Sequence, residues 1–183
     1  MPTPLHQAAA TLGAAGHDHW IEALEDGSHV LIRPLRADDR ELERAFLERL
    51  SPMNRKLRFH GEVKVSERLL DSLLDVDYQQ TMAFIALVHE DGELREVGIC
   101  RYAAVDATQC ECALTTADDF KRRGLEAALM RHLIEVARRN DFKRMYSIDQ
   151  AIDRDMRDVA LQLGFRAVRD PDDATRVIRS LQL

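Results

Sequence analysis

Several short stretches of the chain alternate apolar and polar residues, as strands do when one of their faces is buried. One such run begins at His29 and stops at Pro34. Asp91-Gly92 lies between two apolar runs and predicts a hairpin, because this dipeptide favours the tightest hairpin turns. The strands predicted in this way cover His29–Leu35, the two halves of Met82–Val105, Gln109–Thr116, Arg144–Ile148, Phe165–Val168 and Arg176–Leu183.

Other segments repeat apolar residues every three or four positions, which predicts amphipathic helices. In the first of them, Asp38 and Glu41 have the spacing of a capping box, with Asp38 as N-cap. Ser51 and Ser66 each precede a helical pattern and are predicted as further N-caps. The predicted helices cover Ala37–Leu50, a short segment after Ser51, Ser66–Leu74, Arg123–Arg139 and Asp153–Leu163.

The order of these elements predicts one α/β domain over residues 28–183. We expect a mixed, mostly antiparallel central sheet with helices on both faces. Residues 1–27 form an Ala-rich extension in front of this domain, which is either flexible or helical around Gln7–Thr11. Trp20 and Ile21 are the residues of the extension that we expect to pack on the domain.

The composition is that of a globular protein, with 45% hydrophobic and 32% charged residues among 183. A net charge of -6 argues against general binding to nucleic acids or to anionic membranes. No apolar run approaches the roughly 20 residues that span a bilayer, and the N-terminus does not have the pattern of a secretory signal. We therefore expect a cytoplasmic protein with neither a nucleic-acid nor a membrane partner.

The cysteines and histidines do not predict a metal site. The three cysteines lack CxxC spacing, which is typical of reduced thiols. Cys110 and Cys112 lie two apart in a predicted strand and share one face, so packing in the core is the simpler interpretation of them. Three histidines without cysteine partners are scattered through the N-terminal extension: His6, His17 and His19.

The stretch ALTTADDFKRRGLEAALM runs from Ala113 to Met130, where a predicted strand leads into the longest predicted helix. A helix N-terminus has unpaired N–H groups and a partial positive charge, so it attracts anions. Gly124 lets the backbone approach a phosphate closely, and the basic run Lys121–Arg123 adds electrostatic attraction. The alternative interpretation is a solvated helix start without a ligand.

This strand, loop and helix, followed by a strand, a helix and Leu163-Gly164-Phe165, resembles the GNAT superfamily of acyl-CoA-dependent N-acyltransferases. The resemblance extends from about Val30 to the C-terminus. It is closest to the acyltransferase domain of bacterial protein lysine acetyltransferases, in the segments IRPLRADD, FLERLSP, LRFHG, VGICRY, ADDFKRRGL and VALQLGF. It implies transfer of an acetyl group from acetyl-CoA to an amine by a monomer or homodimer. A protein lysine is one candidate acceptor.

The resemblance also implies roles for individual residues. Glu111 would be the general base that deprotonates the amine through water, and a backbone N–H near Leu114 would stabilise the oxyanion. The alternative for Glu111 is an exposed acid at a strand edge. Asp153 stands where the family has an asparagine that contacts pantetheine. The residues expected to bind acyl-CoA are Leu114, Thr116, Lys121, Arg122, Arg123, Gly124, Leu125, Glu126, Ala127 and Asp153.

Glu126 departs from the family motif Q/R-x-x-G-x-G/A, in which Lys121 takes the first place and Gly124 is the first glycine. Its carboxylate would repel a pyrophosphate, unless it rotates outward or pairs with Arg122 or Arg123. Three functions remain open on this evidence. The chain is an N-acetyltransferase, a degenerate GNAT domain that acts as a binding or regulatory module, or a dimeric sensor of another small molecule.

Overall fold

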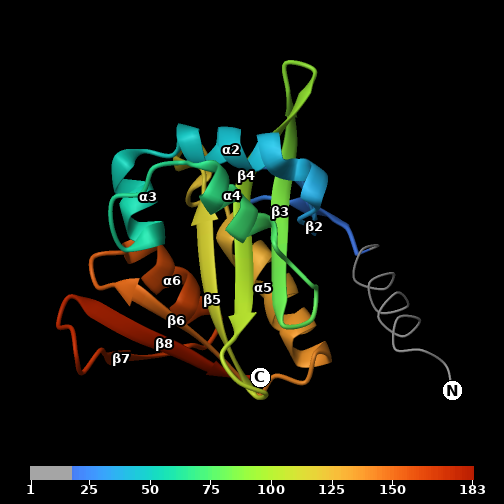
Figure 1. Cartoon of the computed structure of the whole chain (residues 1–183). Helices are drawn as coiled ribbons and strands as arrows, with labels where there is room; N and C mark the ends of the chain where they lie inside the picture. Colours follow the sequence, from blue (N-terminus) through green and yellow to red (C-terminus); the bar gives the residue numbers. More distant parts are fainter. Residues whose placement is uncertain (1–17) are drawn as a thin grey trace, which may run out of the picture.

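The alternating segments of the sequence pair into an eight-stranded sheet in the computed structural model, which describes residues 18–183 (Figure 1). The strand order is β1-β2-β3-β4-β5-β6-β8-β7, and β5 and β6 pair in parallel while the other neighbours are antiparallel. This confirms the predicted fold class. The strands are β1 (Trp20–Ala23), β2 (His29–Pro34), β3 (Thr81–Glu90), β4 (Glu93–Ala104), β5 (Gln109–Thr116), β6 (Arg144–Gln150), β7 (Arg166–Arg169) and β8 (Arg176–Gln182).

Helices cover the sheet on both faces, each through its own apolar side. They are the 3-10 turns η1 (Ala37–Asp39) and η2 (Asp118–Phe120), and the α-helices α2 (Arg40–Arg49), α3 (Pro52–Phe59), α4 (Glu67–Leu74), α5 (Leu125–Arg139) and α6 (Arg154–Gln162). Figure 1 shows α2, α3 and α4 in front of the sheet and α5 behind it. The two layers together leave β5 and β6 in the middle of the molecule.

Several local predictions are confirmed. Asp91 and Gly92 join β3 to β4 with φ angles of 52° and 85°, the left-handed values that the shortest hairpin turns require. Ser51 and Ser66 cap α3 and α4, and each side chain accepts a hydrogen bond from the backbone N–H three residues later. These elements depend on neighbouring residues, which explains why the sequence predicts them.

The predicted capping box of Asp38 and Glu41 is wrong. The 3-10 turn η1 comes first, and α2 begins only at Arg40 without a side-chain cap. The neighbouring Asp39 instead forms two hydrogen bonds of 2.7 Å with the guanidinium of Arg33 on β2. This buried ion pair fixes the start of α2 against the sheet, and it outweighs the local capping preference.

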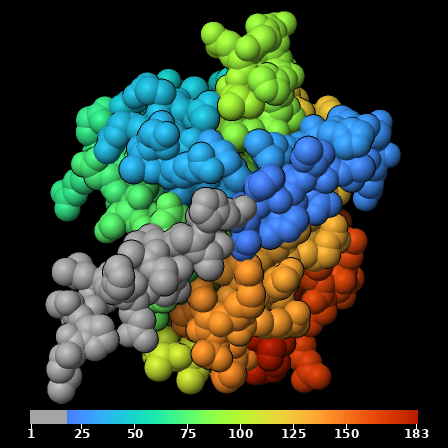
Figure 2. Space-filling model, turned by 90° about the vertical axis from the view of Figure 1, so that its right-hand side faces the viewer, coloured from blue at the N-terminus to red at the C-terminus, as the bar shows by residue number. Residues whose placement is uncertain are grey.

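The strand β1 is not predicted by the sequence pattern, and it lies within the segment 1–27 that we expected to precede the domain. It pairs with β2 and also contacts α5, where the ring of Trp20 stacks on His132 at a centroid distance of 3.9 Å. Glu22 lies 2.7 Å from the same imidazole. In Figure 2 this N-terminal segment (blue) lies beside the α5 region (orange). The helix predicted around Gln7–Thr11 lies outside the described residues.

Two carboxyl groups are buried together between α2 and the sheet. Glu96 on β4 is 0% exposed and Glu43 on α2 is 1% exposed. Neither oxygen of Glu96 has a hydrogen-bond partner. Burial raises the pKa of Glu96 well above its ordinary value, and the nearby charge of Glu43 raises it further. The folded protein therefore keeps a proton on this pair at pH values where the unfolded chain releases it.

This pair predicts a pH-dependent stability. Because the folded pKa of Glu96 lies above its ordinary value of 4.5, the free energy of unfolding falls as pH rises through the interval between the two. The slope is roughly 1.4 kcal/mol per pH unit for one carboxyl group. Glu96→Gln removes this titration in both states. We expect urea unfolding of the variant at pH 5, 6 and 7 to show a correspondingly flatter dependence than the wild type.

Glu93→Gln is the matched control, because Glu93 is an exposed glutamate on the same strand. It should leave the pH dependence of the unfolding free energy unchanged. Parallel curves for the wild type and Glu96→Gln would show that the pair carries no retained proton.

Candidate functional site

The two parallel strands at the centre of the sheet separate soon after they meet. β5 and β6 pair over three positions, Gln109 with Arg144, Cys110 with Met145 and Glu111 with Tyr146. The antiparallel pairing of β4 with β5 continues to Thr116. The part of β5 after Glu111 therefore has a strand on one side and an open edge on the other.

The hydrogen bonds of β5 identify which backbone groups face this open edge. The N–H of Ala117 donates to the carbonyl of Val97 at 2.8 Å, and the N–H of Val105 donates to Gln109 at 2.9 Å. Bonded and non-bonded pairs alternate in an antiparallel ladder. Leu114 belongs to the set of alternate residues that do not bond to β4, so its N–H and C=O groups point away from β4 and into the gap beside β6.

Three cavities follow this gap in sequence. The cleft cavity, of about 120 Å³, lies beside Glu111, Leu114 and Asp149. It shares Leu114 and Asp153 with a neck of about 30 Å³. The neck shares Glu126 and Asp155 with the mouth, a cavity of about 220 Å³ at the start of α5. Together the three adjoining cavities mark a path from the end of the β5–β6 pairing to the helix N-terminus.

The glycine of the predicted motif shapes the mouth. Gly124 precedes α5 with a φ angle of 84°, which L-residues with side chains rarely adopt. A Cβ at this position would lie 3.2 Å from the Oε1 atom of Glu25. Glu25 belongs to the turn between β1 and β2, and its N–H donates to the carbonyl of Arg123 at 2.9 Å. The N-terminal turn thus forms one wall of the mouth and brings a second carboxylate to it.

The carboxylate of Glu126 points into the protein. Its side chain is buried, the residue being 6% exposed, and Oε1 accepts a hydrogen bond of 2.8 Å from the hydroxyl of Thr116. Neither of the two arrangements that would remove the conflict with a pyrophosphate is present. The side chain does not rotate into solvent, and Arg122 and Arg123 form ion pairs with other acids.

The basic run of the motif is neutralised by acids within the chain. Lys121 lies 3.2 Å from Asp155, and Arg122 lies 3.4 Å from the same residue. Arg123 pairs with Asp26 at 2.8 Å. The residues that line the mouth include four acids, Glu25, Glu126, Asp155 and Asp158, and one base, Arg122. These groups fit a pyrophosphate poorly, although the first N–H groups of α5 have no partner within the helix.

Other residues of the predicted site contribute through their position. The side chains of Leu125 and Ala127 are buried, so only their backbone groups can contact a ligand at the start of α5.

Glu111 is exposed and lines the cleft cavity. Burial raises the pKa of its neighbour Tyr146, and the charge of Glu111 raises it further. The carboxylate of Glu111 therefore lies where an incoming amine could reach it.

Asp153 lines both the cleft cavity and the neck, and it is the N-cap residue of α6. Its carboxylate accepts a hydrogen bond of 3.0 Å from the N–H of Met156 and caps the helix. Burial raises the pKa of Asp153, and this hydrogen bond acts in the opposite direction. An asparagine oxygen would cap the helix equally well. Aspartate in place of asparagine at position 153 therefore preserves the helix cap, but it adds an ionisable group to the cavity.

Some residues of the site were not predicted. Asn54 on α3 donates to the carbonyl of Thr116 at 2.8 Å, and so helps to hold the buried C-terminal end of β5. Asp149 on β6 lines the cleft cavity and pairs with the buried Arg179 at 2.7 Å. Arg58 on α3 lines the same cavity. The sequence contains no local motif around these residues, which reach the site only through the packing of α3, β6 and β8.

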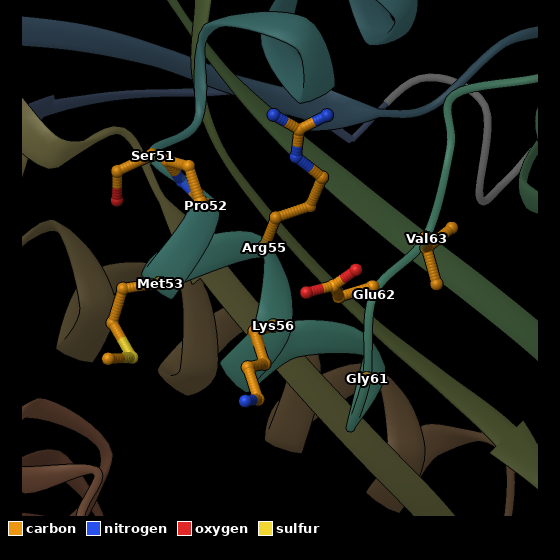
Figure 3. Close-up of a pocket in the computed structure, with 8 residues that line it drawn as sticks. All are labelled: Ser51, Pro52, Met53, Arg55, Lys56, Gly61, Glu62 and Val63. Atoms are coloured by element: carbon orange, nitrogen blue, oxygen red, sulfur yellow. The ribbon is translucent and has the colours of Figure 1, made fainter.

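A separate cavity of about 540 Å³ lies on the outer side of α3. Figure 3 shows Met53, Arg55 and Lys56 leaving the helix, with Glu62 and Val63 on the segment opposite. Its lining residues differ from those of the cleft cavity. Asn54 and Arg58 on one side of α3 therefore belong to the site, and Arg55 and Lys56 belong to the other side.

The remaining polar candidates have structural positions. Cys100, Cys110 and Cys112 are free and buried, in agreement with the packing interpretation. His132 stacks on Trp20, as described above. Within residues 18–183, no group of three or more metal-binding side chains has the geometry to hold an ion, while His6 and His17 lie outside this range. In the same range, no helix is both long and apolar enough to cross a membrane.

Comparison with known proteins gives consistent results. Residues 41–165 match the model of a family described as "Acetyltransferase (GNAT) family". A protein of Pseudomonas aeruginosa named Acetyltransferase PA5475 is 62% identical over 177 residues, which cover 96% of this chain and 95% of that protein.

Two solved structures share the fold. The GNAT domain of S. lividans PAT has a TM-score of 0.81 and 22% identity, over 90% of this chain and 97% of that one. A cAMP-binding acyltransferase from Mycobacterium smegmatis has a TM-score of 0.63 and 23% identity, and the match covers 100% of this chain and 53% of that one. At 22% and 23% identity, these two structural matches show that the chain shares their fold.

Proposed function

The chain belongs to the GNAT acetyltransferase family, and on this premise we propose that it transfers an acetyl group from acetyl-CoA to an amine. The observation that carries the proposal is the open edge of β5 at Leu114, beside Glu111. Exposed N–H and C=O groups at a strand edge can pair with the amides of an extended pantetheine arm. The path from the cleft cavity to the mouth gives this arm a direction.

The chemistry follows from the groups along the path. An alkyl amine titrates near 10.4, so at neutral pH it must lose a proton before its nitrogen can attack. Glu111 takes this proton through a water molecule, and the nitrogen then attacks the thioester carbonyl. The N–H of Leu114 donates to the oxyanion that forms. The intermediate expels the CoA thiolate, and the second proton of the attacking nitrogen passes through water to this thiolate, so that the neutral amide and CoA remain.

A second candidate function has support in the structure. The buried Glu126 and the acids around it oppose a pyrophosphate at the place where the family binds one. A domain that has lost acyl-CoA binding could still act as a binding or regulatory module. The two functions differ in one measurable property, the affinity for acetyl-CoA.

The charge of Glu126 gives the first test. Two unit charges 5 Å apart repel by about 3 kcal/mol at an effective dielectric of 20, or about a hundredfold in Kd. We expect Glu126→Gln to bind acetyl-CoA 10 to 100 times more tightly than the wild type, roughly 1.4 to 2.8 kcal/mol. Isothermal calorimetry measures both constants, and Glu126→Gly separates the effect of side-chain bulk from that of charge.

Glu135→Gln serves as the control for this experiment, because Glu135 is an exposed glutamate on the same helix. It should bind acetyl-CoA as the wild type does. Equal affinities for the wild type and Glu126→Gln would mean that the carboxylate does not oppose the ligand. Absence of binding in every variant would favour the degenerate module.

The role of Glu111 gives the second test. Glu111→Gln keeps the size of the side chain and removes its basicity, so we expect kcat to fall by about 100-fold or more near neutral pH. The rate of the variant should rise with pH as free amine becomes available. The measurement is the acetylation rate between pH 6 and 10, with the Kd for acetyl-CoA as a check that the donor site is intact. A variant with the wild-type rate across this range would exclude Glu111 as the base.

A further inference from the structure

Arg58 is a charged residue of the cleft cavity that the proposed reaction does not use. It projects from α3 into the same cavity as Glu111. Within residues 18–183 its guanidinium forms no hydrogen bond and no ion pair, and its contact is with the ring of Phe59, 4.9 Å from the centroid. A guanidinium carries five donors in a rigid fork that suits a carboxylate. This fork is without a partner in the cavity.

A second unpaired guanidinium lies close to the first. Arg101 is on β4, opposite Ala113 of β5, and its Nη1 atom is buried without a hydrogen-bond partner. Burial lowers the pKa of Arg58 to about 10, and the charge of Arg101 also lowers it. Two like charges that are partly removed from water raise each other's energy, and an anion between or beside them would relieve this.

The acids of the chain compensate these two charges only in part. Glu43 and Glu111 act on Arg58 from beyond ion-pair distance. Glu43 forms no ion pair with either guanidinium, and burial raises its own pKa. The described part of the chain thus supplies no carboxylate within 4 Å of either guanidinium, although other arginines form 13 such pairs.

The opposite wall of the cleft cavity is negative. Glu111 on β5, Asp149 on β6 and Asp153 at the start of α6 line it, while Arg58 approaches from α3. Asp149 already pairs with Arg179 and the carboxylate of Asp153 caps α6, so Glu111 is the acid that a ligand amine would meet. The cavity therefore has a positive side and a negative side, which fits a molecule that carries both charges.

We propose that the amine acceptor is a small molecule that also carries a carboxylate, bound with the carboxylate on Arg58 and the amine beside Glu111. This inference rests on the proposed acetyl transfer and specifies its acceptor. The cavity is small, about 120 Å³, and Arg58 and Glu111 both line it, so one small molecule can reach the two residues together. A protein lysine brings no carboxylate on its side chain and would leave Arg58 unpaired.

The test compares amino acids with their amides. β-Alanine, 4-aminobutyrate, 6-aminohexanoate and L-lysine are each offered with acetyl-CoA, in parallel with the corresponding primary amide. We expect kcat/KM for the best acid to exceed that for its amide by at least about tenfold, because a charge-assisted bond to Arg58 is lost in the amide. Ratios near one for all four pairs in the wild type would overturn the inference.

Variants of α3 locate the effect. Arg58→Gln should reduce the ratio of acid to amide to about one, and Arg58→Lys, which keeps a cation, should retain part of it. Arg55→Gln is the matched control, because Arg55 lies on the other cavity and donates to the carbonyl of Leu50 at 3.3 Å. An undiminished ratio in folded Arg58→Gln would contradict the assignment.

Calorimetry separates this inference from the proposed function. If the wild type acetylates none of the eight amines, the transferase proposal fails for these acceptors, and binding of the same compounds is measured without acetyl-CoA. Binding of an acid but not its amide, lost in Arg58→Gln, would support the carboxylate site. Absence of binding of all four acids would overturn it.

Discussion

The separation of β5 from β6 after three residue pairs is the constraint on which the site depends. It leaves backbone donors and acceptors unpaired in the middle of a sheet, where such groups are costly unless a ligand or water satisfies them. The surrounding elements maintain the gap, because β8 continues the sheet beyond β6 and Asn54 holds the carbonyl of Thr116 from α3. The cleft cavity and Glu111 both lie where this pairing ends.

At the other end of the path, the same chain departs from what a phosphate ligand prefers. The N-terminal turn brings Glu25 to Gly124, and Thr116 draws Glu126 inward. Both acids act at the positive end of α5, where they stabilise the empty protein. A ligand with a pyrophosphate must compete with this arrangement. The fold of the donor site therefore favours acyl-CoA binding, while its electrostatics oppose it. The affinity for acetyl-CoA decides which of the two effects is larger.

Sequence reasoning predicted what depends on neighbouring residues. The hairpin at Asp91-Gly92 and the serine caps are of this kind, and the sheet with its two helical layers follows from periodicity. The strand β1 was missed because four residues give little pattern and their position depends on contacts with α5. The direction of the Glu126 side chain depends on Thr116, ten residues earlier. The unpaired state of Arg58 is a property of packing that no spacing in the sequence reveals.

The charges beneath α2 connect the core with the cleft. Glu43 affects the pKa of Glu96 and of Arg58, and the charges of Arg101 and Glu111 also affect the pKa of Arg58. Burial raises the pKa of both carboxyl groups, Glu43 and Glu96, and neither of them forms an ion pair with the two arginines. The positive charges of Arg58 and Arg101 are thus not neutralised by an ion pair with these buried acids. Within residues 18–183, Arg58 therefore reaches the cleft cavity without a carboxylate in ion-pair distance, and a ligand is the group that can supply one.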